Sequence, residues 1–163
     1  MADDAIKDAL KMMPYGFYAV TSKSSDDVNA MVANWITQIS FEPRLVAFGL
    51  QKSSHTRSVI ENGRVFAVNL FSKDDREKMM PFTKGRTRNP DKMKEAQYTE
   101  APETGCPVLD GAAAFIEFEV ADIVDPGGDH DIVIGKPVGA GVLKPGDASQ
   151  TLTLPDIGWS YAG

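Results

Sequence analysis

Hydroxyl, imidazole and cationic side chains gather directly after one of the most apolar stretches of the chain, residues 45–50. The segment that follows, residues 57–62, is predicted to be a short helix closed by Gly63. The first turn of a helix has unpaired N–H groups and a partial positive charge, so it attracts phosphate. Ser and Thr also dominate N-caps, so an ordinary helix start capped by Ser54 fits equally. The side chains concerned are Lys52, Ser53, Ser54, His55, Thr56 and Arg57.

A second segment, residues 33–40, combines amide and hydroxyl groups with an aromatic ring. Amide side chains carry both donors and acceptors, so they suit a flat heteroaromatic ligand that offers both kinds of group. The alternative is the polar end of a strand, with the ring of Trp35 in the hydrophobic core. The candidate contacts are Asn34, Trp35, Ile36, Thr37, Gln38 and Ser40.

A third segment, residues 81–86, carries a hydroxyl group on Thr83 and cations on Lys84 and Arg86. Lysine binds phosphate as a point charge and arginine binds it as a fork, so the segment could support a phosphate site. A solvated basic loop is the alternative.

His130 follows a glycine turn and lies between Asp129 and Asp131. A histidine in this position is a candidate proton donor or substrate contact, or a plain part of an exposed turn. We predict no metal site, because His55 is the only other histidine and no ligand spacing supports one.

Composition excludes several classes of function. A net charge of −6 and a pI of about 4.9 argue against nucleic acid or an anionic membrane as the main partner. Cys106 is the only cysteine, so an intramolecular disulfide or a cysteine-based metal site is ruled out, which fits the cytoplasm. The acidic start predicts no signal peptide, and no apolar run approaches the ~20 residues of a membrane helix. Motifs of Rossmann domains, P-loops and nucleophile elbows are missing.

The apolar patterns predict mainly β structure with a few short helices. Apolar and acidic side chains alternate with period two in residues 114–120, as in a half-buried antiparallel strand. Residues 83–107 have little apolar pattern and read as a long polar excursion. Strands are predicted over residues 16–21, 28–35, 45–51, 64–71, 112–124, 131–138 and 139–143, with a last short one over 151–154. Helices are predicted over residues 5–13, 57–62 and 72–80. Such an order favours an all-β barrel or sandwich with helical insertions.

Five motifs occur in one order along nearly the whole chain. They are an opening strand in residues 16–21, a polar strand and loop in residues 28–43, a Ser/Thr loop in residues 52–56, an F-x-V-N-L strand in residues 66–70, and a Gly-Asp-His turn with a following I-G strand in residues 128–135. In this order and spacing the chain resembles the flavin-reductase-like, FMN-binding split-barrel family, and within it the small stand-alone members.

The resemblance implies one domain over residues 1–163, folded as a six-stranded antiparallel Greek-key split β-barrel. It implies a homodimer with FMN, or less expectedly FAD, near the interface. Ser53, Ser54 and Thr56 would hold the phosphate with help from Lys84, and His130 would act on the nicotinamide side as the catalytic residue. The whole expected cofactor-binding set is Asn34, Trp35, Ile36, Thr37, Gln38, Ser40, Gln51, Ser53, Ser54, His55, Thr56, Phe82, Thr83 and Lys84.

The expected function is that of a cytoplasmic FMN-dependent oxidoreductase. It would accept hydride from NAD(P)H and pass electrons to free flavin, ferric iron or a small redox partner. The first alternative is a flavin-binding electron carrier or sensor without NAD(P)H turnover of its own. The second is a β-barrel binding module without flavin.

Overall fold

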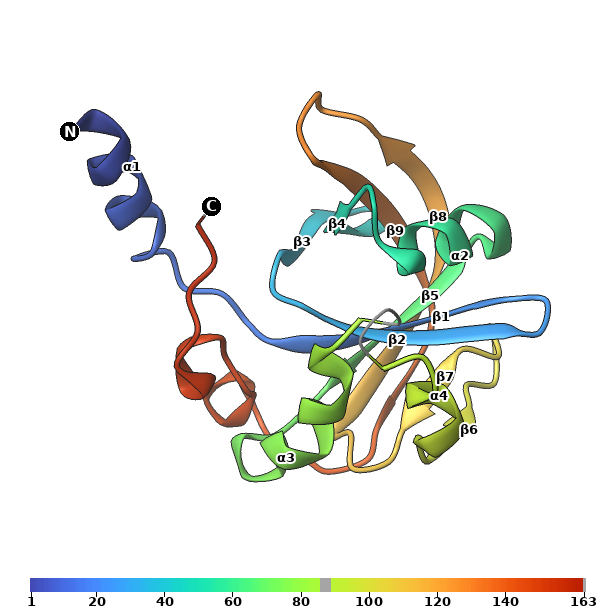
Figure 1. Ribbon diagram of the computed structural model, residues 1–163. Coiled ribbons are helices and arrows are strands. Elements are labelled where there is room, and N and C mark those ends of the chain that lie inside the picture. Colours follow the sequence, from blue (N-terminus) through green and yellow to red (C-terminus); the bar gives the residue numbers. More distant parts are fainter. Residues whose placement is uncertain (86–88, 163) are drawn as a thin grey trace.

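The computed structural model describes residues 1–85 and 89–162 and contains one large antiparallel sheet (Figure 1). Among these residues the sheet has seven strands in the order β2-β1-β5-β8-β9-β4-β3. Its strands are β1 (Tyr18–Ser24), β2 (Asp27–Ala33), β3 (Ile36–Phe41), β4 (Arg44–Gln51), β5 (Val65–Leu70), β8 (Ala114–Val124) and β9 (His130–Val142). A separate hairpin pairs β6 (Tyr98–Glu100) with β7 (Pro107–Leu109).

Short helices surround the sheet. The α-helices are α1 (Ala2–Leu10), α2 (His55–Gly63), α3 (Arg76–Met79) and α4 (Lys92–Glu95). The 3-10 helices are η1 (Lys73–Asp75), η2 (Met80–Thr83), η3 (Ala148–Gln150) and η4 (Pro155–Ile157). The prediction of mainly β structure with a few short helices is therefore confirmed.

The two edge strands of the sheet, β2 and β3, follow each other in the sequence. Only Asn34 and Trp35 connect them. Because so short a connection cannot cross a flat sheet of seven strands, the sheet must curl until its two edges approach each other. The connection therefore lies at the place where the two ends of the sheet meet.

Apolar side chains fill both faces of the curled sheet. The inner core joins α2 to six strands, and its buried members are Val20, Ala33, Phe48, Leu50, Ile60, Phe66, Val68, Phe118 and Val133. Phe66 and Phe118 stack within it, with ring centroids 4.8 Å apart. The outer core lies beneath α3, α4, η2 and the segment after residue 150, and its buried members are Phe17, Ala19, Ala30, Phe71, Met79, Phe82, Met93, Leu109, Ala112, Leu152 and Leu154.

One strand is missing from the sequence prediction. Residues 28–35 were expected to form a single strand, but β2 ends at Ala33 and residues 36–41 form β3, so the sheet has seven strands rather than six. As an edge strand, β3 leaves Thr37, Gln38 and Ile39 exposed in succession. The period-two alternation that identifies a half-buried strand is therefore absent from it.

Residues 131–138 and 139–143 form one continuous strand, β9, instead of the two predicted. Gly139, at which the second predicted strand begins, is needed for packing. A Cβ at Gly139 would lie 2.4 Å from Oε2 of the buried Glu117 on β8. Gly139 thus makes room for a carboxylate and does not mark a turn.

The long polar segment over residues 83–107 is ordered in its described part, because buried polar groups of the sheet form hydrogen bonds with it. The hydroxyl group of Thr21 donates to the carbonyl of Pro107 at 2.6 Å, and Asn69 Oδ1 accepts from the N–H of Leu109 at 2.9 Å. Glu117 Oε1 accepts three hydrogen bonds, from the N–H groups of residues 103 and 104 and from the Thr104 hydroxyl. These contacts anchor β7, so a β-hairpin forms where no strand was predicted.

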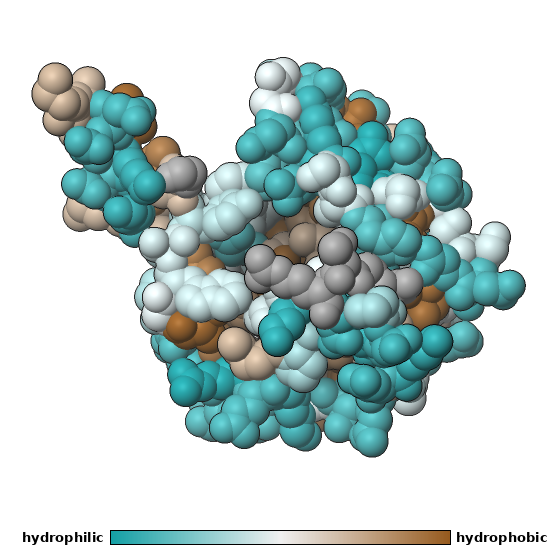
Figure 2. All heavy atoms as spheres, viewed as in Figure 1, coloured by the Kyte–Doolittle hydropathy of each residue, from teal (hydrophilic) through white to brown (hydrophobic). Residues whose placement is uncertain are grey.

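Helix boundaries also differ from the predictions. The first helix covers Ala2–Leu10 instead of residues 5–13, and residues 72–80 divide into η1 and α3. Residues 151–154 make only two isolated bridges, at Thr151 and Thr153. No residue of α1 is buried, and the helix stands clear of the body (Figure 2). Over the described residues, every helix is too short or too polar to cross a bilayer.

Candidate functional site

A cavity of about 210 Å³ lies where the β2–β3 connection meets β4, β9 and the segment after η4. The curl of the sheet brings these elements together. The lining residues that carry polar groups or rings are Phe17, Asn34, Trp35, Gln51, His130, Trp159, Ser160 and Tyr161. Four of them, Asn34, Trp35, Gln51 and His130, belong to the site predicted from the sequence. We refer to this space as the Trp35 cavity.

Three rings form one wall of the Trp35 cavity. The centroid of Trp35 lies 4.8 Å from that of His130 and 4.7 Å from that of Tyr161, with tilted and edge-on geometry. The Tyr161 hydroxyl lies 3.4 Å from His130 Nε2. Sequence reasoning missed Tyr161, although the aromatic pair Trp159 and Tyr161 directly after Gly158 is a signal that could have been noticed.

Gly49 on β4 allows the indole ring of Trp35 to lie against the sheet. A Cβ at this position would lie 3.2 Å from Trp35 Cε3 and 3.3 Å from Trp35 Cβ. The Gly49 N–H also donates to the Trp35 carbonyl at 2.9 Å. The position and orientation of Trp35 therefore depend on a residue without a side chain at position 49.

His130 is oriented by its neighbour. Its Nδ1 lies 2.7 Å from Asp129 Oδ1, and this hydrogen bond is the main cause of the lowered pKa of the Asp129 carboxyl group. The Asp129 carbonyl accepts from the N–H of Lys52, and His130 pairs with Gln51 across β4 and β9. With Nδ1 engaged, Nε2 is the ring nitrogen that remains for a ligand in the cavity.

The side chain of Asn34 is the polar group of the cavity that lacks a partner. Its Nδ2 atom is buried, and no acceptor lies within hydrogen-bonding reach of it in the described part of the chain. An unpaired buried amide donor costs about 1–3 kcal/mol, so native structures rarely keep one without a use.

The N-terminus of α2 lies beside β2, and Ser54 caps it. Ser54 Oγ accepts from the N–H of Arg57 at 3.2 Å and donates to the carbonyl of Gln51 at 2.8 Å. Ser54 therefore caps the helix, as the N-cap alternative predicts. Both neighbouring cations are paired with carboxylates: Lys52 Nζ lies 2.6 Å from Asp125, and Arg57 Nε lies 2.7 Å from Asp131.

Two more residues of the predicted phosphate loop contact β2. The buried hydroxyl group of Thr56 accepts from Asn29 Nδ2 at 2.7 Å, and His55 Nε2 lies 2.9 Å from Asp27 Oδ2. Ser53 is exposed. The loop and the Trp35 cavity thus lie along the same strand.

The remaining predicted residues do not line the cavity. Ile36, Thr37, Gln38 and Ser40 lie on β3, where Thr37 and Gln38 make only local hydrogen bonds. Phe82 is buried in the outer core, and Thr83 donates to the Met80 carbonyl. Lys84 is exposed, and its carbonyl lies 3.3 Å from Lys92 Nζ. Arg86 lies outside the described residues.

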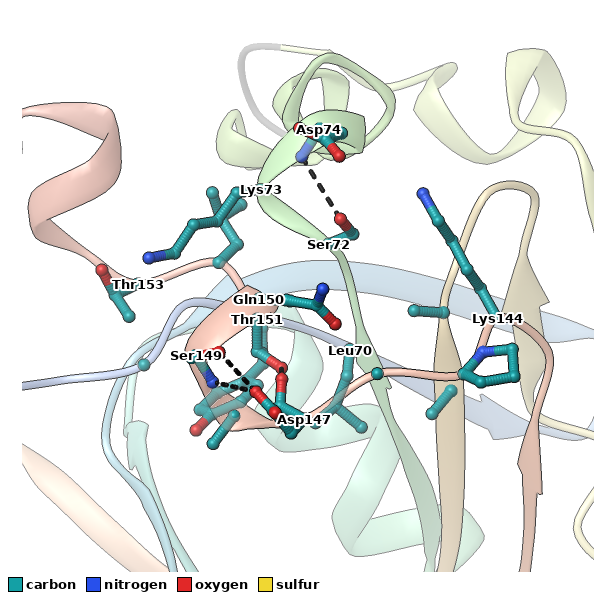
Figure 3. Close-up of a pocket in the computed structure, with 18 of the residues that line it drawn as sticks. Leu70, Ser72, Lys73, Asp74, Lys144, Asp147, Ser149, Gln150, Thr151 and Thr153 are labelled. Atoms are coloured by element: carbon teal, nitrogen blue, oxygen red, sulfur yellow. Dashed lines mark hydrogen bonds between the residues drawn. The ribbon is translucent and has the colours of Figure 1, made fainter.

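A larger cavity, of about 700 Å³, contains none of the predicted site residues (Figure 3). Three of its four charged side chains, those of Lys73, Lys144 and Asp147, are already engaged. Lys144 Nζ lies 3.2 Å from Asp75, Lys73 Nζ lies 3.8 Å from Asp156, and Asp147 accepts from the N–H and hydroxyl group of Ser149. Within residues 1–85 and 89–162, no group of three His, Cys, Asp or Glu side chains could hold a metal ion.

The model of the flavin reductase like domain family matches residues 10–155 of this chain. A high molecular weight rubredoxin of Moorella thermoacetica is 32% identical over 143 residues, which cover 85% of this chain and 61% of that protein. A putative diflavin flavoprotein A 3 of Nostoc sp. is 32% identical over 154 residues, 94% of this chain and 26% of that protein. The chain thus spans less than two thirds of the length of these two relatives.

Solved structures of flavin reductases have the same fold. The NADH:FAD oxidoreductase SgcE6 of Streptomyces globisporus is 25% identical, with a TM-score of 0.72 over 80% of this chain and 76% of that one. BorF, the flavin reductase component of a bacterial two-component tryptophan halogenase, has a TM-score of 0.77 over 93% of this chain and 92% of that one. Because BorF is only 22% identical to this chain in sequence, the similarity shows a shared fold and no more.

Proposed function

Because the chain belongs to the flavin reductase-like family, we propose that it is an FMN-binding oxidoreductase that uses NAD(P)H. It would pass electrons to free flavin, ferric iron or a small redox partner. When bound, the flavin supplies the redox chemistry, by accepting a hydride and releasing electrons. The task of the protein is to bind and orient the two ring systems and to exclude water from them.

The observation that carries this proposal is the buried, unpaired Nδ2 of Asn34 beside the ring of Trp35. A flat heteroaromatic ring with carbonyl groups at its edge would accept a hydrogen bond from this amide and lie against the indole. An aliphatic or purely hydrophobic ligand would leave the donor unpaired, at a cost in affinity. The residues present therefore fit an isoalloxazine ring.

The position of α2 supports FMN as the flavin. Thr56 contacts β2 at Asn29, and β2 lines the Trp35 cavity with Met31 to Ala33, two to four positions later. Two to four residues span roughly 7–13 Å of a strand, so an elongated ligand could reach from the cavity to the first-turn N–H groups of α2. The hydroxyl groups of Ser53 and Thr56 would add donors to a terminal phosphate there, and the exposed Lys84 would add charge.

His130 would receive the nicotinamide. Asp129 holds Nδ1, so Nε2 is directed to a ligand and can donate to a carboxamide oxygen when His130 carries a proton on that atom. The side chain of His130 is 16% exposed, which limits the access of water to it.

We further propose a homodimer with the flavin near its interface and a sheet that closes as the Greek-key split barrel of the family. The exposed edge strand β3 supports the first idea, because Ile39 is 50% exposed and Phe41 is 86% exposed. The two-residue connection between β2 and β3 supports closure of the sheet as a split barrel.

The test is a comparison of flavin binding by the native chain and by Asn34→Ala. FMN titrated into flavin-free protein should lose its fluorescence on binding, and the variant should bind about 10-fold to 100-fold more weakly. NADH or NADPH added under argon should then bleach the flavin of the native protein. A protein that takes up no flavin would overturn the proposal.

An electron carrier without NAD(P)H turnover is the second candidate. The observation in its favour is Tyr161, whose hydroxyl group already lies near the His130 nitrogen that a nicotinamide would need. Bound flavin that stays oxidised for minutes after addition of NADH and NADPH, but is reduced by dithionite, would support the carrier.

A further inference from the structure

The segment Trp159–Tyr161 forms part of the lining of the Trp35 cavity. Trp159, Ser160 and Tyr161 all line the cavity, together with Trp35 and His130. Their presence reduces the space to about 210 Å³, below the ~300–1,000 Å³ of typical small-molecule sites. The segment therefore occupies part of the room that a second ring system would need.

Tyr161 contacts the two side chains that would recognise a planar donor, Trp35 and His130. Its ring lies against the indole of Trp35, at 4.7 Å between centroids and 60° between planes. Its hydroxyl group lies 3.4 Å from His130 Nε2, while Asp129 engages Nδ1. A planar ligand that stacks in this position and bonds to His130 would meet both contacts already made by the protein itself.

Few contacts hold the segment in place. The N–H of Trp159 reaches the Leu154 carbonyl at 3.4 Å, and the Trp159 ring meets Phe17 edge-on at 5.8 Å. Tyr161 is 41% exposed, and its hydrogen bond to His130 is long. Both features favour a segment that can leave the cavity without unfolding the sheet.

We propose that Tyr161 is a competing internal ligand of the nicotinamide position, so that the donor must displace it before reduction. This inference rests on the proposed flavin and nicotinamide function. A donor that binds only the open form has an apparent dissociation constant equal to its intrinsic constant divided by the fraction of molecules that are open. One aromatic pair contributes enough for a shift of about 3-fold to 10-fold.

The first experiment uses the flavin-free protein and needs no activity. Trp159→Phe leaves Trp35 as the only tryptophan and keeps an aromatic ring against Phe17. In this background, Tyr161→Ala should increase the quenching of Trp35 fluorescence by acrylamide, whereas Tyr161→Phe should not, because the ring remains. Equal quenching in both would overturn the proposal.

The second experiment measures the reduction of bound flavin by NADH and NADPH in a stopped-flow instrument. With FMN at saturating concentration, Tyr161→Ala should lower the donor concentration for half-maximal rate about 3-fold to 10-fold, and NAD⁺ should bind more tightly by the same factor. Weaker NAD⁺ binding would mean that Tyr161 is a wall of the site, which contradicts competition. If no variant binds FMN or is reduced, the proposed function itself has failed, and the quenching result still decides whether Tyr161 covers Trp35.

Discussion

Two asparagine side chains in different parts of the molecule have opposite surroundings. Asn69 on β5 is fully buried, its Oδ1 accepts from Leu109, and its Nδ2 lies 3.4 Å from both Thr21 Oγ1 and the Pro107 carbonyl. Asn34 has a buried Nδ2 without a partner in the described structure. The same functional group therefore completes the fold in one place and is left incomplete in the other.

The difference separates residues that stabilise the protein from residues that await a ligand. Around Asn69, polar side chains of the sheet replace the water lost by the backbone of β7, and each bond removes a desolvation cost. At Asn34 no hydrogen bond offsets the desolvation cost of the buried amide, and the nearest space is a cavity lined by aromatic rings. A bound ring with a carbonyl edge would remove it, which is why we place flavin there and not in the larger cavity.

The largest expected effect concerns Asn69. Asn69→Ala leaves the N–H of Leu109 without its acceptor in a buried site, so the free energy of unfolding should fall by about 2–4 kcal/mol. Urea denaturation measures it. Asn34→Ala is the matched control and should not lower the stability of the flavin-free protein, because no hydrogen bond is lost and an unpaired buried donor is removed. Equal losses in the two variants would contradict the distinction.

The second effect is a pH dependence that involves Cys106, within the anchored segment. Burial is the main cause that raises the pKa of its thiol to about 11. The unfolded chain releases this proton near the ordinary pKa of about 8.5 to 9, whereas the folded chain keeps it. Stability should therefore be full below pH ~8.5 and fall as the pH rises towards 11, by about 2–3 kcal/mol.

Cys106→Ala is the reference for that measurement, because it removes the thiol and leaves every other titrating group. Urea denaturation at several pH values between 8 and 11 should give a native-minus-variant difference that declines with pH. A constant difference would show that the thiol is no more acidic in the unfolded chain than in the folded one, which contradicts the prediction.

The sequence was sufficient for what depends on local pattern. Patterns in neighbouring residues were enough to predict the family, the β-rich architecture and the helix start at Ser54. They also grouped the polar side chains of Asn34 and Gln51 with Trp35 and His130 in one candidate site. Strand β3 was missed because its exposed edge removes the alternation. Anchoring of Pro107 and Leu109 was missed because their partners, Thr21 and Asn69, lie 86 and 38 to 40 positions away. Tyr161 was missed because 31 residues separate it from His130.

A smaller effect would test Gly49, which makes room for Trp35. Gly49→Val places a branched side chain where even a Cβ lies 3.2 Å from the indole ring. Trp35 should move into the cavity, and FMN affinity should fall about 10-fold. Ala148→Trp is the control, because it adds bulk at the larger cavity, and it should leave FMN affinity unchanged. Loss of affinity in the control alone would move the flavin to the larger cavity.

The smallest expected effect separates the cap from the phosphate site at Ser54. Glycine replaces serine at an N-cap at a cost of only a few tenths of a kcal/mol, so Ser54→Gly should keep α2 folded. If the hydroxyl group also contacts the phosphate of FMN, the variant should bind FMN about 3-fold to 10-fold more weakly and bind riboflavin, which lacks the phosphate, as well as the native protein does. Fluorescence titrations with both flavins measure this. Equal losses for FMN and riboflavin would mean that Ser54 acts only through the helix, and the first-turn N–H groups of α2 would then have to hold the phosphate without it.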